Sequence, residues 1–203
     1  MTSATDYKPS AGEVKRLRDD TGAGMIDCRN ALVRAAGDYD AAKRDLNELG
    51  QSKALKKSER TANEGLIGQY IHAGGKIGVL VEVNCETDFV ARSEPFRELV
   101  KDVAMHIAAM SPQYVSREEV PADVVTAQRE DLRKSVPQDK APAIAERILE
   151  GKLNKWYEEH VLLEQAFVKD EAQTVAERIG SVVGVLGEKI AVRRFAKYAL
   201  GEG

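Results

Sequence analysis

The sequence predicts an α+β protein, in which an N-terminal three-helix bundle is followed by a core of helices packed on a small antiparallel three-stranded sheet. Three observations lead to this prediction. Apolar residues recur at helical spacing up to residue 50, they alternate or cluster as in strands between residues 64 and 84, and helical spacing returns after residue 93. An antiparallel helical hairpin is expected to project from the core at about 117–155.

Residues 1–50 are expected to form the bundle as a separate domain. Ser10 can begin the first helix and Asp38 the third, because their side-chain oxygens can accept hydrogen bonds from backbone N–H groups of the first turn. A glycine in the left-handed conformation can end each helix. These glycines are Gly22, Gly37 and Gly50. The side chains expected in the core include Val14, Leu17, Met25, Cys28, Leu32 and Leu46.

Residues 51–63, "QSKALKKSERTAN", carry no apolar face wide enough to be buried, so we expect a charged linker or a solvated helix there. Four cations in this segment offer an alternative interpretation as a nucleic-acid patch. They are Lys53, Lys56, Lys57 and Arg60. A solvated charge run is favoured, because no aromatic side chains that could stack on bases lie between the cations.

Residues 64–203 are expected to form a second domain around the sheet. The strand-like pattern of residues 64–84 is interrupted by Ala73, Gly74 and Gly75, which indicates a β-hairpin. A third strand is predicted near the C-terminus, where Ile190 and Val192 alternate with other residues. Because such a small sheet with an open edge is marginally stable, helices should cover one side and a second copy of the chain the other.

Helices are predicted between the second and third strands. Ser93 can cap a helix with Pro95 in its first turn. The apolar stripe of that helix comprises Phe96, Leu99, Val100, Val103, Ile107 and Ala108. The hairpin is predicted as two charged helices around "PQDK" (Pro137–Lys140), and residues 169–184 as an amphipathic helix that leads into the last strand. The side chains expected to meet inside the hairpin are Val124, Val125, Gln128, Leu132, Val136, Ile144, Ile148 and Leu153.

Composition favours a cytoplasmic protein. A net charge of −3 provides no general attraction to nucleic acid or to a membrane. The apolar stretches are shorter than the roughly 18 residues that span a bilayer, and the N-terminus lacks the apolar region of a signal peptide. Cys28 and Cys85 are expected to be buried thiols, with a disulfide or a shared metal as the alternative.

The sequence contains no recognisable catalytic or cofactor-binding motif, so we predict no enzyme, no cofactor and no metal site. The three histidines, His72, His106 and His160, lie far apart and form no metal-binding pattern. The glycines of "GAGM" (Gly22–Met25) follow no predicted strand, which makes a phosphate-binding loop improbable. The remaining class of function is binding to another macromolecule.

The stretch "CETDFVARSEPF" (Cys85–Phe96) places Phe89 between the second strand and the next helix. Core filling is the more common role for such a phenylalanine. Thr87 as an N-cap, with Asp88 bonding to backbone N–H groups, would explain the turn without any function. However, Phe96 already gives the next helix an aromatic core residue. The residues alone therefore leave open whether Phe89 fills the core or faces a partner.

Several stretches resemble the bacterial elongation factor Ts family, whose members exchange guanine nucleotides on elongation factor Tu. The two most specific are "VKRLRDDTGAGMIDCRNAL" (Val14–Leu32) and "VEVNCETDFVAR" (Val81–Arg92). The others are His106–Val115, Ile144–Glu159 and Ile190–Gly203, so the resemblance covers nearly the whole chain in the same order. It implies that the N-terminal bundle is of the ubiquitin-associated type and that the protein performs no covalent chemistry.

By this resemblance, the chain binds elongation factor Tu in its GDP-bound and nucleotide-free forms and promotes GDP release so that GTP can rebind. The turn that is implied to displace Mg²⁺ on the partner consists of Thr87, Asp88, Phe89 and Val90. The bundle positions that face the partner in the family are matched here by Lys15, Arg18, Met25 and Ile26. Methionine is also common in the family where Ile26 stands, and the apolar character is kept.

Long members of the family carry a duplicated core, whereas this chain has room for one, so it resembles the short form. The short form implies a homodimer that binds two copies of elongation factor Tu. The hairpin at 117–155 resembles the coiled-coil protrusion of the family. Two functions of other classes remain as alternatives: a helical adaptor that only binds partners, and an RNA-binding accessory protein that uses Lys53–Arg60.

Overall fold

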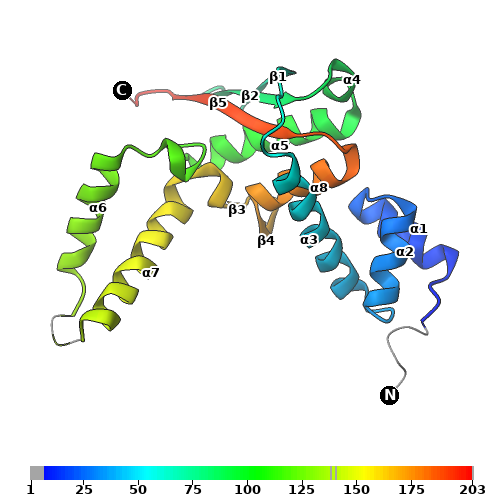
Figure 1. The fold of residues 1–203 in the computed structure, drawn as a ribbon. Helices are drawn as coiled ribbons and strands as arrows, with labels where there is room; N and C mark the ends of the chain where they lie inside the picture. Colours follow the sequence, from blue (N-terminus) through cyan, green and yellow to red (C-terminus); the bar gives the residue numbers. More distant parts are fainter. Residues whose placement is uncertain (1–6, 138, 140, 203) are drawn as a thin grey trace. The chain divides into compact units, whose positions relative to one another are not determined.

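The computed structural model describes residues 7–137, 139 and 141–202, and its α+β architecture confirms the predicted fold class (Figure 1). Three helices come first in the chain and are followed by a hairpin of two strands. The third strand of this sheet comes last, which gives the strand order β1-β2-β5 and an antiparallel sheet, as predicted. Helices occupy most of the chain between its second and third strands.

The chain forms two compact units. The first comprises the residues up to Gly68, together with Glu82–Asp102 and Ala176–Arg193. The second comprises Gln69–Val81, Val103–Val175 and the residues from Arg194 onwards. The three long strands contribute residues to both units, so neither unit is a continuous stretch of sequence. The division of the chain into domains at 1–50, 51–63 and 64–203 stays a prediction, and its residues 1–6, 138, 140 and 203 lie outside the described part.

Capping interactions define the first helices, as the sequence indicates. α1 (Ala11–Thr21) starts with a capping box, in which the Ser10 hydroxyl accepts a hydrogen bond from the Glu13 N–H at 3.2 Å and the Glu13 carboxylate accepts one from the Ser10 N–H at 2.7 Å. The helix ends at Gly22, whose φ of +69° is the left-handed conformation that favours glycine. Two backbone N–H groups at the start and, through the Gly22 N–H, the Arg18 carbonyl at the end are thereby satisfied.

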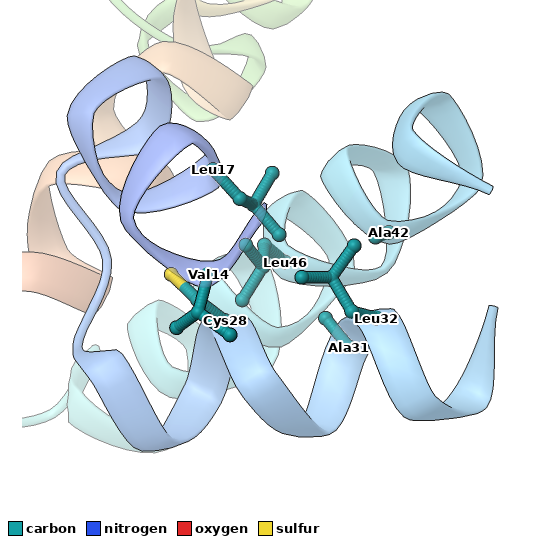
Figure 2. Packing of buried hydrophobic residues seen from close by; sticks show 7 residues of the cluster. All are labelled: Val14, Leu17, Cys28, Ala31, Leu32, Ala42 and Leu46. Atoms are coloured by element: carbon teal, nitrogen blue, oxygen red, sulfur yellow. The ribbon is translucent and has the colours of Figure 1, made fainter. Parts of the chain in front are cut away.

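α2 (Met25–Arg34) and α3 (Tyr39–Lys57) complete the bundle. α3 begins at Asp38, whose carboxylate accepts a hydrogen bond from the Ala41 N–H at 2.9 Å, as predicted. Figure 2 shows the side chains of all three helices converging on one core. Its buried members are Val14, Leu17, Cys28, Ala31, Leu32, Ala42 and Leu46. Met25 was expected in this core, but it is 46% exposed because the first turn of α2 lies at the rim.

Gly50 does not end the third helix, so the prediction of its C-terminus is wrong. α3 continues to Lys57, and only residues 58–63 lie between it and the first strand. The missing side chain of Gly50 serves close packing, because a Cβ atom added there would lie 2.8 Å from the carbonyl oxygen of Gly180. Residues 51–63 were expected to be either a charged linker or a solvated helix. Up to Lys57 they are helical, and the rest connects α3 to the first strand.

β1 (Glu64–Ile71) and β2 (Ile77–Cys85) form the predicted hairpin, closed by a hydrogen bond of 2.9 Å from the His72 N–H to the Ile77 carbonyl. β5 (Ile190–Ala199) is the neighbour of β2 on its other side. Alternate residues of β2 are buried, namely Val79, Val81, Val83 and Cys85. Leu80, which points to the opposite face, is 49% exposed. One face of β2 is thus packed, and the other is open to solvent at Leu80.

Two helices supply further buried stripes. α5 (Glu94–Met110) buries every apolar residue predicted for it, from Phe96 to Ala108. α8 (Val175–Leu186) buries one side as well, through Val175, Ile179, Val182 and Val183. Asp102 of α5 pairs with Arg178 of α8, with 3.5 Å between the carboxylate and the guanidinium. This pair joins the two helices within the first compact unit.

The predicted helix over residues 169–184 is wrong at its start. Asp170–Thr174 form a strand, β4, which pairs antiparallel with β3 (Ala166–Phe167). The helix begins only at Val175, whose N–H donates a hydrogen bond to the Gln165 carbonyl at 3.0 Å. Pairing with β3, only a few residues earlier in the chain, satisfies backbone groups that a helix would otherwise have satisfied, and this pairing is not visible in the apolar spacing.

α6 (Ala122–Lys134) and α7 (Pro142–His160) form the predicted helical hairpin, with bounds shifted towards the C-terminus. A short turn, η1 (Arg117–Glu119), precedes α6, and η2 (Leu162–Glu164) follows α7. Ion pairs cross between the helices, with Arg129 lying 2.6 Å from Glu150. The predicted break Pro137–Lys140 lies in part outside the described residues.

Burial within the hairpin differs in detail from the expected pattern. Leu149, Leu153 and Tyr157 of α7 are buried, whereas Ile144 is 51% exposed and was wrongly expected to face α6. Val120, Val124, Val125, Leu132 and Trp156 belong to the same apolar cluster as Leu153. Burial is concentrated in the part of α7 nearer its C-terminus, where Val120 and Val161 add apolar contacts.

Candidate interaction site

The candidate site begins where β2 ends, at the one-turn helix α4 (Asp88–Ala91). Thr87 precedes it in extended conformation, and its hydroxyl oxygen accepts a hydrogen bond from the Val90 N–H at 3.3 Å. Thr87 is therefore the N-cap that the sequence predicts. A helix of one turn is too short to be stable through its own backbone hydrogen bonds. Contacts with the rest of the protein must hold this turn in place.

Phe89 points away from the protein, with 81% of its surface exposed. Its neighbours Val90 and Ala91 are each only 5% exposed. Successive helical residues point about 100° apart, so burial of Val90 and Ala91 turns Phe89 outwards. Phe96, at the start of α5, is fully buried and is the aromatic residue that fills the core. The core-filling interpretation of Phe89 is therefore wrong.

Asp88 is also exposed, and it does not serve the purely structural role considered for it. Its carboxylate forms an ion pair of 2.8 Å with Arg92, one helical turn later. The two side chains are 61% and 75% exposed, so this pair contributes little to stability. The turn thus presents an acidic and an aromatic side chain to solvent, and neither is required by the packing beneath it.

Two acidic residues, Glu188 and Glu86, join the segment of the turn to the segment that begins the last strand. The carboxylate of Glu188 accepts hydrogen bonds from the N–H groups of Glu86 and Thr87 at 3.1 and 3.0 Å, and from the Thr87 hydroxyl at 2.7 Å. Glu86 in turn accepts a hydrogen bond of 2.6 Å from the Lys189 N–H and pairs with Arg60 at 3.3 Å. The pKa of Glu86 is lowered below its ordinary value, chiefly by the hydrogen bond from the Lys189 N–H and also by the hydrogen bond and charge of Arg60.

Sequence reasoning missed both of these bracing residues. Glu188 lies 101 residues after Thr87, and the two meet only because β5 lies beside β2 in the sheet. A local signal for this contact is absent from the sequence, where Glu188 is one acidic residue among many in a chain of 31% charged residues.

The cysteines are free buried thiols, as predicted. The Cys85 thiol donates a hydrogen bond to the Thr87 carbonyl at 3.2 Å and so supports the approach to the turn. Burial, followed by the negative charge of Glu188, raises the pKa of Cys85 to about 11. Burial likewise raises the pKa of Cys28. Both residues are therefore neutral packing groups and poor nucleophiles.

The predicted positions of the bundle lie on its surface. Lys15 and Arg18 are exposed on α1, each next in sequence to a buried residue, Val14 or Leu17. Met25 and Ile26 begin α2 and are 46% and 75% exposed. Together they place an apolar pair and two cations on a bundle that belongs to the same compact unit as the turn. The structure thus leaves all of these predicted side chains accessible to a partner.

The cations of residues 51–63 are mostly engaged within the chain. Lys53 pairs with Asp27 at 2.9 Å, and the Lys57 ammonium donates a hydrogen bond to the Gly187 carbonyl at 2.5 Å. Arg60 pairs with Glu86, as described above. Lys56 is exposed. Such intramolecular pairing weakens the nucleic-acid interpretation, which requires a row of cations that are available to phosphates.

Two of the three histidines, His106 and His160, serve in packing, whereas His72 is exposed. His106 is fully buried on α5, and its two ring nitrogens are engaged by Gln165 and by the Val168 N–H. His160 stacks on Trp156, with 4.6 Å between the ring centroids. Among the residues that the structure describes, no group of three or more histidine, cysteine, aspartate or glutamate side chains could hold a metal ion. In the same part of the chain, no helix is long and apolar enough to cross a membrane.

Comparison with known proteins agrees with the resemblance seen in the sequence. The family model described as elongation factor TS matches residues 39–202. Elongation factor Ts of Geobacter metallireducens is 53% identical over 195 residues, which cover 96% of this chain and 90% of that protein. Elongation factor Ts of Caldanaerobacter subterraneus subsp. tengcongensis is 51% identical over 195 residues, with coverages of 96% and 98%.

These matches place the chain among the elongation factors of protein synthesis. Identity of this level over nearly the full length of both sequences is found only between members of one family. The chain belongs to the elongation factor Ts family.

Proposed function

We propose that this chain is a guanine-nucleotide exchange factor that binds elongation factor Tu carrying GDP and promotes release of the GDP, so that GTP can rebind. The observation that carries the proposal is the exposure of Phe89 on a turn whose neighbouring residues are buried or braced. Membership of the elongation factor Ts family names the partner. Both cysteines are free, which fits a reducing compartment, and we place the reaction in the cytoplasm.

The Thr87–Val90 turn displaces Mg²⁺ in this mechanism. The Mg²⁺ ion at a nucleotide site is a large local charge that neutralises phosphate oxygens. Asp88 and Phe89 enter the partner beside that site, and Phe89 separates side chains that support the metal ligands. GDP then loses much of its binding energy without proton transfer or covalent bonds. The chain itself requires neither a cofactor nor a metal for this step.

Linkage sets the energetic condition for exchange. The factor must bind nucleotide-free elongation factor Tu more tightly than the GDP-bound form, and GDP weakens the factor by as much as the factor weakens GDP. A rigid side chain that fits only the distorted nucleotide site provides this difference in affinity. Phe89 is suited to the role, because an aromatic ring has few rotatable bonds and a large contact surface.

The bundle provides the separate docking surface. Lys15 and Arg18 can pair with acidic groups of the partner, and Met25 with Ile26 can insert into an apolar depression. Full burial of one exposed side chain of this size against a partner contributes about 1.5–3 kcal/mol to binding. Docking through the bundle increases the local concentration of the Thr87–Val90 turn at the nucleotide site.

A homodimer that binds two copies of elongation factor Tu is the assembly we propose. Apolar side chains remain exposed on the part of the sheet that belongs to the second compact unit. They are Ile71, Leu80, Tyr198 and Leu200. They line a shallow groove of about 560 Å³. A second copy of the chain is the occupant, because a small sheet of this kind needs its open side covered.

Release of labelled GDP from purified elongation factor Tu tests the proposed function. The intact chain should accelerate release, and Phe89→Ala should lower the rate by at least about tenfold, as expected for loss of a central contact. Because Phe89 is exposed, this variant should keep its free energy of unfolding within about 0.5 kcal/mol. Leu55→Ala, which removes an apolar side chain that is 74% exposed on α3, is the matched control and should leave exchange unchanged. A folded Phe89→Ala variant that accelerates GDP release as fast as the unmodified chain would refute the proposal.

A further inference from the structure

Glu188 occupies a fixed position between the last helix and the last strand. α8 ends at Leu186, and Gly187 follows in the left-handed conformation with φ +74°. The Gly187 N–H donates a hydrogen bond to the Val183 carbonyl at 2.9 Å, which closes the helix. β5 begins at Ile190. With a helix end on one side and a strand on the other, the backbone around Glu188 has little freedom.

The Glu188 carboxylate uses both of its oxygens on the segment that leads into the Thr87–Val90 turn. One oxygen accepts the N–H groups of Glu86 and Thr87, and the other accepts the Thr87 hydroxyl. All three hydrogen bonds have an ionised acceptor, which makes each stronger than a bond between neutral groups. The same hydroxyl oxygen accepts the Val90 N–H. A continuous chain of hydrogen bonds therefore links Glu188 to the middle of α4.

The brace is reciprocal, because the two segments hold each other. Glu86, next to the turn, accepts the Lys189 N–H, next to Glu188. The Lys189 ammonium extends the contact by donating hydrogen bonds to the carbonyl groups of Ser58 and Arg60 at 2.7 and 2.8 Å. The segment before β1, the end of β2 and the start of β5 are thus joined at one point.

We infer that Glu188 is a positioning residue for nucleotide exchange, whose carboxylate fixes the direction in which Phe89 projects. This inference rests on the proposed function. Burial of Val90 and Ala91 holds one side of the turn, and Glu188 holds the other. With both sides fixed, Phe89 is presented in one orientation before the partner binds. A preorganised contact loses less conformational entropy on binding, and more of its energy is available to distort the nucleotide site.

Substitutions at Glu188 should lower the exchange rate in a graded order. Glu188→Gln keeps the shape and can accept the two N–H groups through its oxygen, although without the ionic charge. We expect it to lose about threefold in the rate of GDP release at saturating factor, and Glu188→Ala to lose about tenfold. Glu98→Gln, on the exposed side of α5, makes the same change of charge and should have no effect.

Three measurements separate positioning from a general loss of structure. Urea unfolding reports the stability of each variant, and titration of the factor separates its half-maximal concentration from the saturated rate. We expect Glu188→Gln to lower the saturated rate while the half-maximal concentration changes by less than about twofold. A double variant with Phe89→Ala provides the third readout. If Glu188 acts through Phe89, then Glu188→Gln should change the rate of that variant by less than about twofold.

The outcomes distinguish the two proposals. If Phe89→Ala lowers exchange but Glu188→Gln and Glu188→Ala do not, the positioning role is wrong and the proposed function stands. If the effects of Glu188→Gln and Phe89→Ala multiply in the double variant, Glu188 acts by another route and the inference is also wrong. If Phe89→Ala leaves exchange intact, the failure lies in the proposed function. A Glu188→Ala variant that does not fold leaves the decision to the Glu188→Gln measurements.

Discussion

Gly50 of α3 lies directly against the backbone of Gly180 in α8, so close that a Cβ atom at Gly50 would come within 2.8 Å of the Gly180 carbonyl oxygen. Gly184, one turn further along α8, also lies close, since a Cβ atom added there would be 3.3 Å from the Gly50 Cα. The two helices of the first compact unit can approach in this way only because these positions lack side chains.

The first prediction concerns this close approach. Gly50→Ala should destabilise the protein by about 1–2 kcal/mol, because the contact with backbone atoms outweighs the higher helix propensity of alanine. Gly151→Ala is the matched control, since Gly151 lies within α7 with no atom near its Cβ position. It should gain about 0.5–1 kcal/mol. Equal gains for both variants in urea unfolding would show that α3 and α8 are not packed this closely.

A second prediction addresses docking through the bundle. Ile26→Ser removes an apolar side chain that is 75% exposed, and it should raise the concentration of factor needed for half-maximal exchange by about fivefold to tenfold. The saturated rate should change little, because the Thr87–Val90 turn is intact. Leu55→Ser makes the same kind of change at a residue that is 74% exposed, and it should alter neither quantity. Identical behaviour of the two variants would argue against a docking role for Ile26.

The proposed homodimer gives a third prediction. Light scattering or sedimentation at micromolar concentration should report twice the chain mass of 22.3 kDa. Leu80→Arg places a charge on the open face of the sheet and should shift the protein to a monomer, since burial of an unpaired charge is strongly unfavourable. Ile144→Arg, at a residue of similar exposure on α7, should leave the mass unchanged. A single-chain mass for the unmodified protein would contradict the assembly.

The buried His106 gives a fourth prediction, on pH dependence. Its Nδ1 accepts a hydrogen bond from the Val168 N–H at 3.2 Å, and its Nε2 lies 2.9 Å from the Gln165 side-chain oxygen, which requires the neutral ring. Burial lowers the pKa of His106 below its ordinary value. The unfolded chain therefore binds a proton at higher pH than the folded protein does. The stability that this residue contributes is complete above about pH 6.5 and is lost as the pH falls from there.

Urea unfolding between about pH 7.5 and pH 5.5 measures this effect, which is at most about 1.4 kcal/mol per pH unit for one histidine. His106→Asn should be less stable at neutral pH but should show a flatter dependence on pH across this range. If the variant and the unmodified protein have the same slope, protonation of His106 does not limit stability in mild acid.

Short-range interactions explain which parts of the structure were predictable. The starts of α1 and α3 were correct, because Ser10 and Asp38 bond to N–H groups only three residues away. The buried stripe of α5 and the alternation along β2 were also correct, since both follow from the geometry of one helix and one strand. The resemblance to the family, carried by stretches such as Val81–Arg92, was confirmed by the comparisons.

The errors lie where packing or pairing with another element, rather than local preference, decides the structure. Gly50 has the sequence signature of a helix end, yet α3 passes through it because α8 packs against it. Asp170–Thr174 continue a helical pattern, yet they form a strand because β3 is available for pairing. In both cases the local preference amounts to about 1 kcal/mol or less per residue, which tertiary contacts readily exceed.

By itself, the sequence determined the helices of the bundle, the strands of the sheet and the family to which the chain belongs. Only the tertiary structure decided that Phe89 faces solvent while Phe96 fills the core, and that Glu188 braces the turn from 101 residues away. The physical reason is one of range. Caps and apolar periodicity act over a few residues, whereas the direction of a side chain on a single helical turn is set by whatever the fold places beneath and beside it.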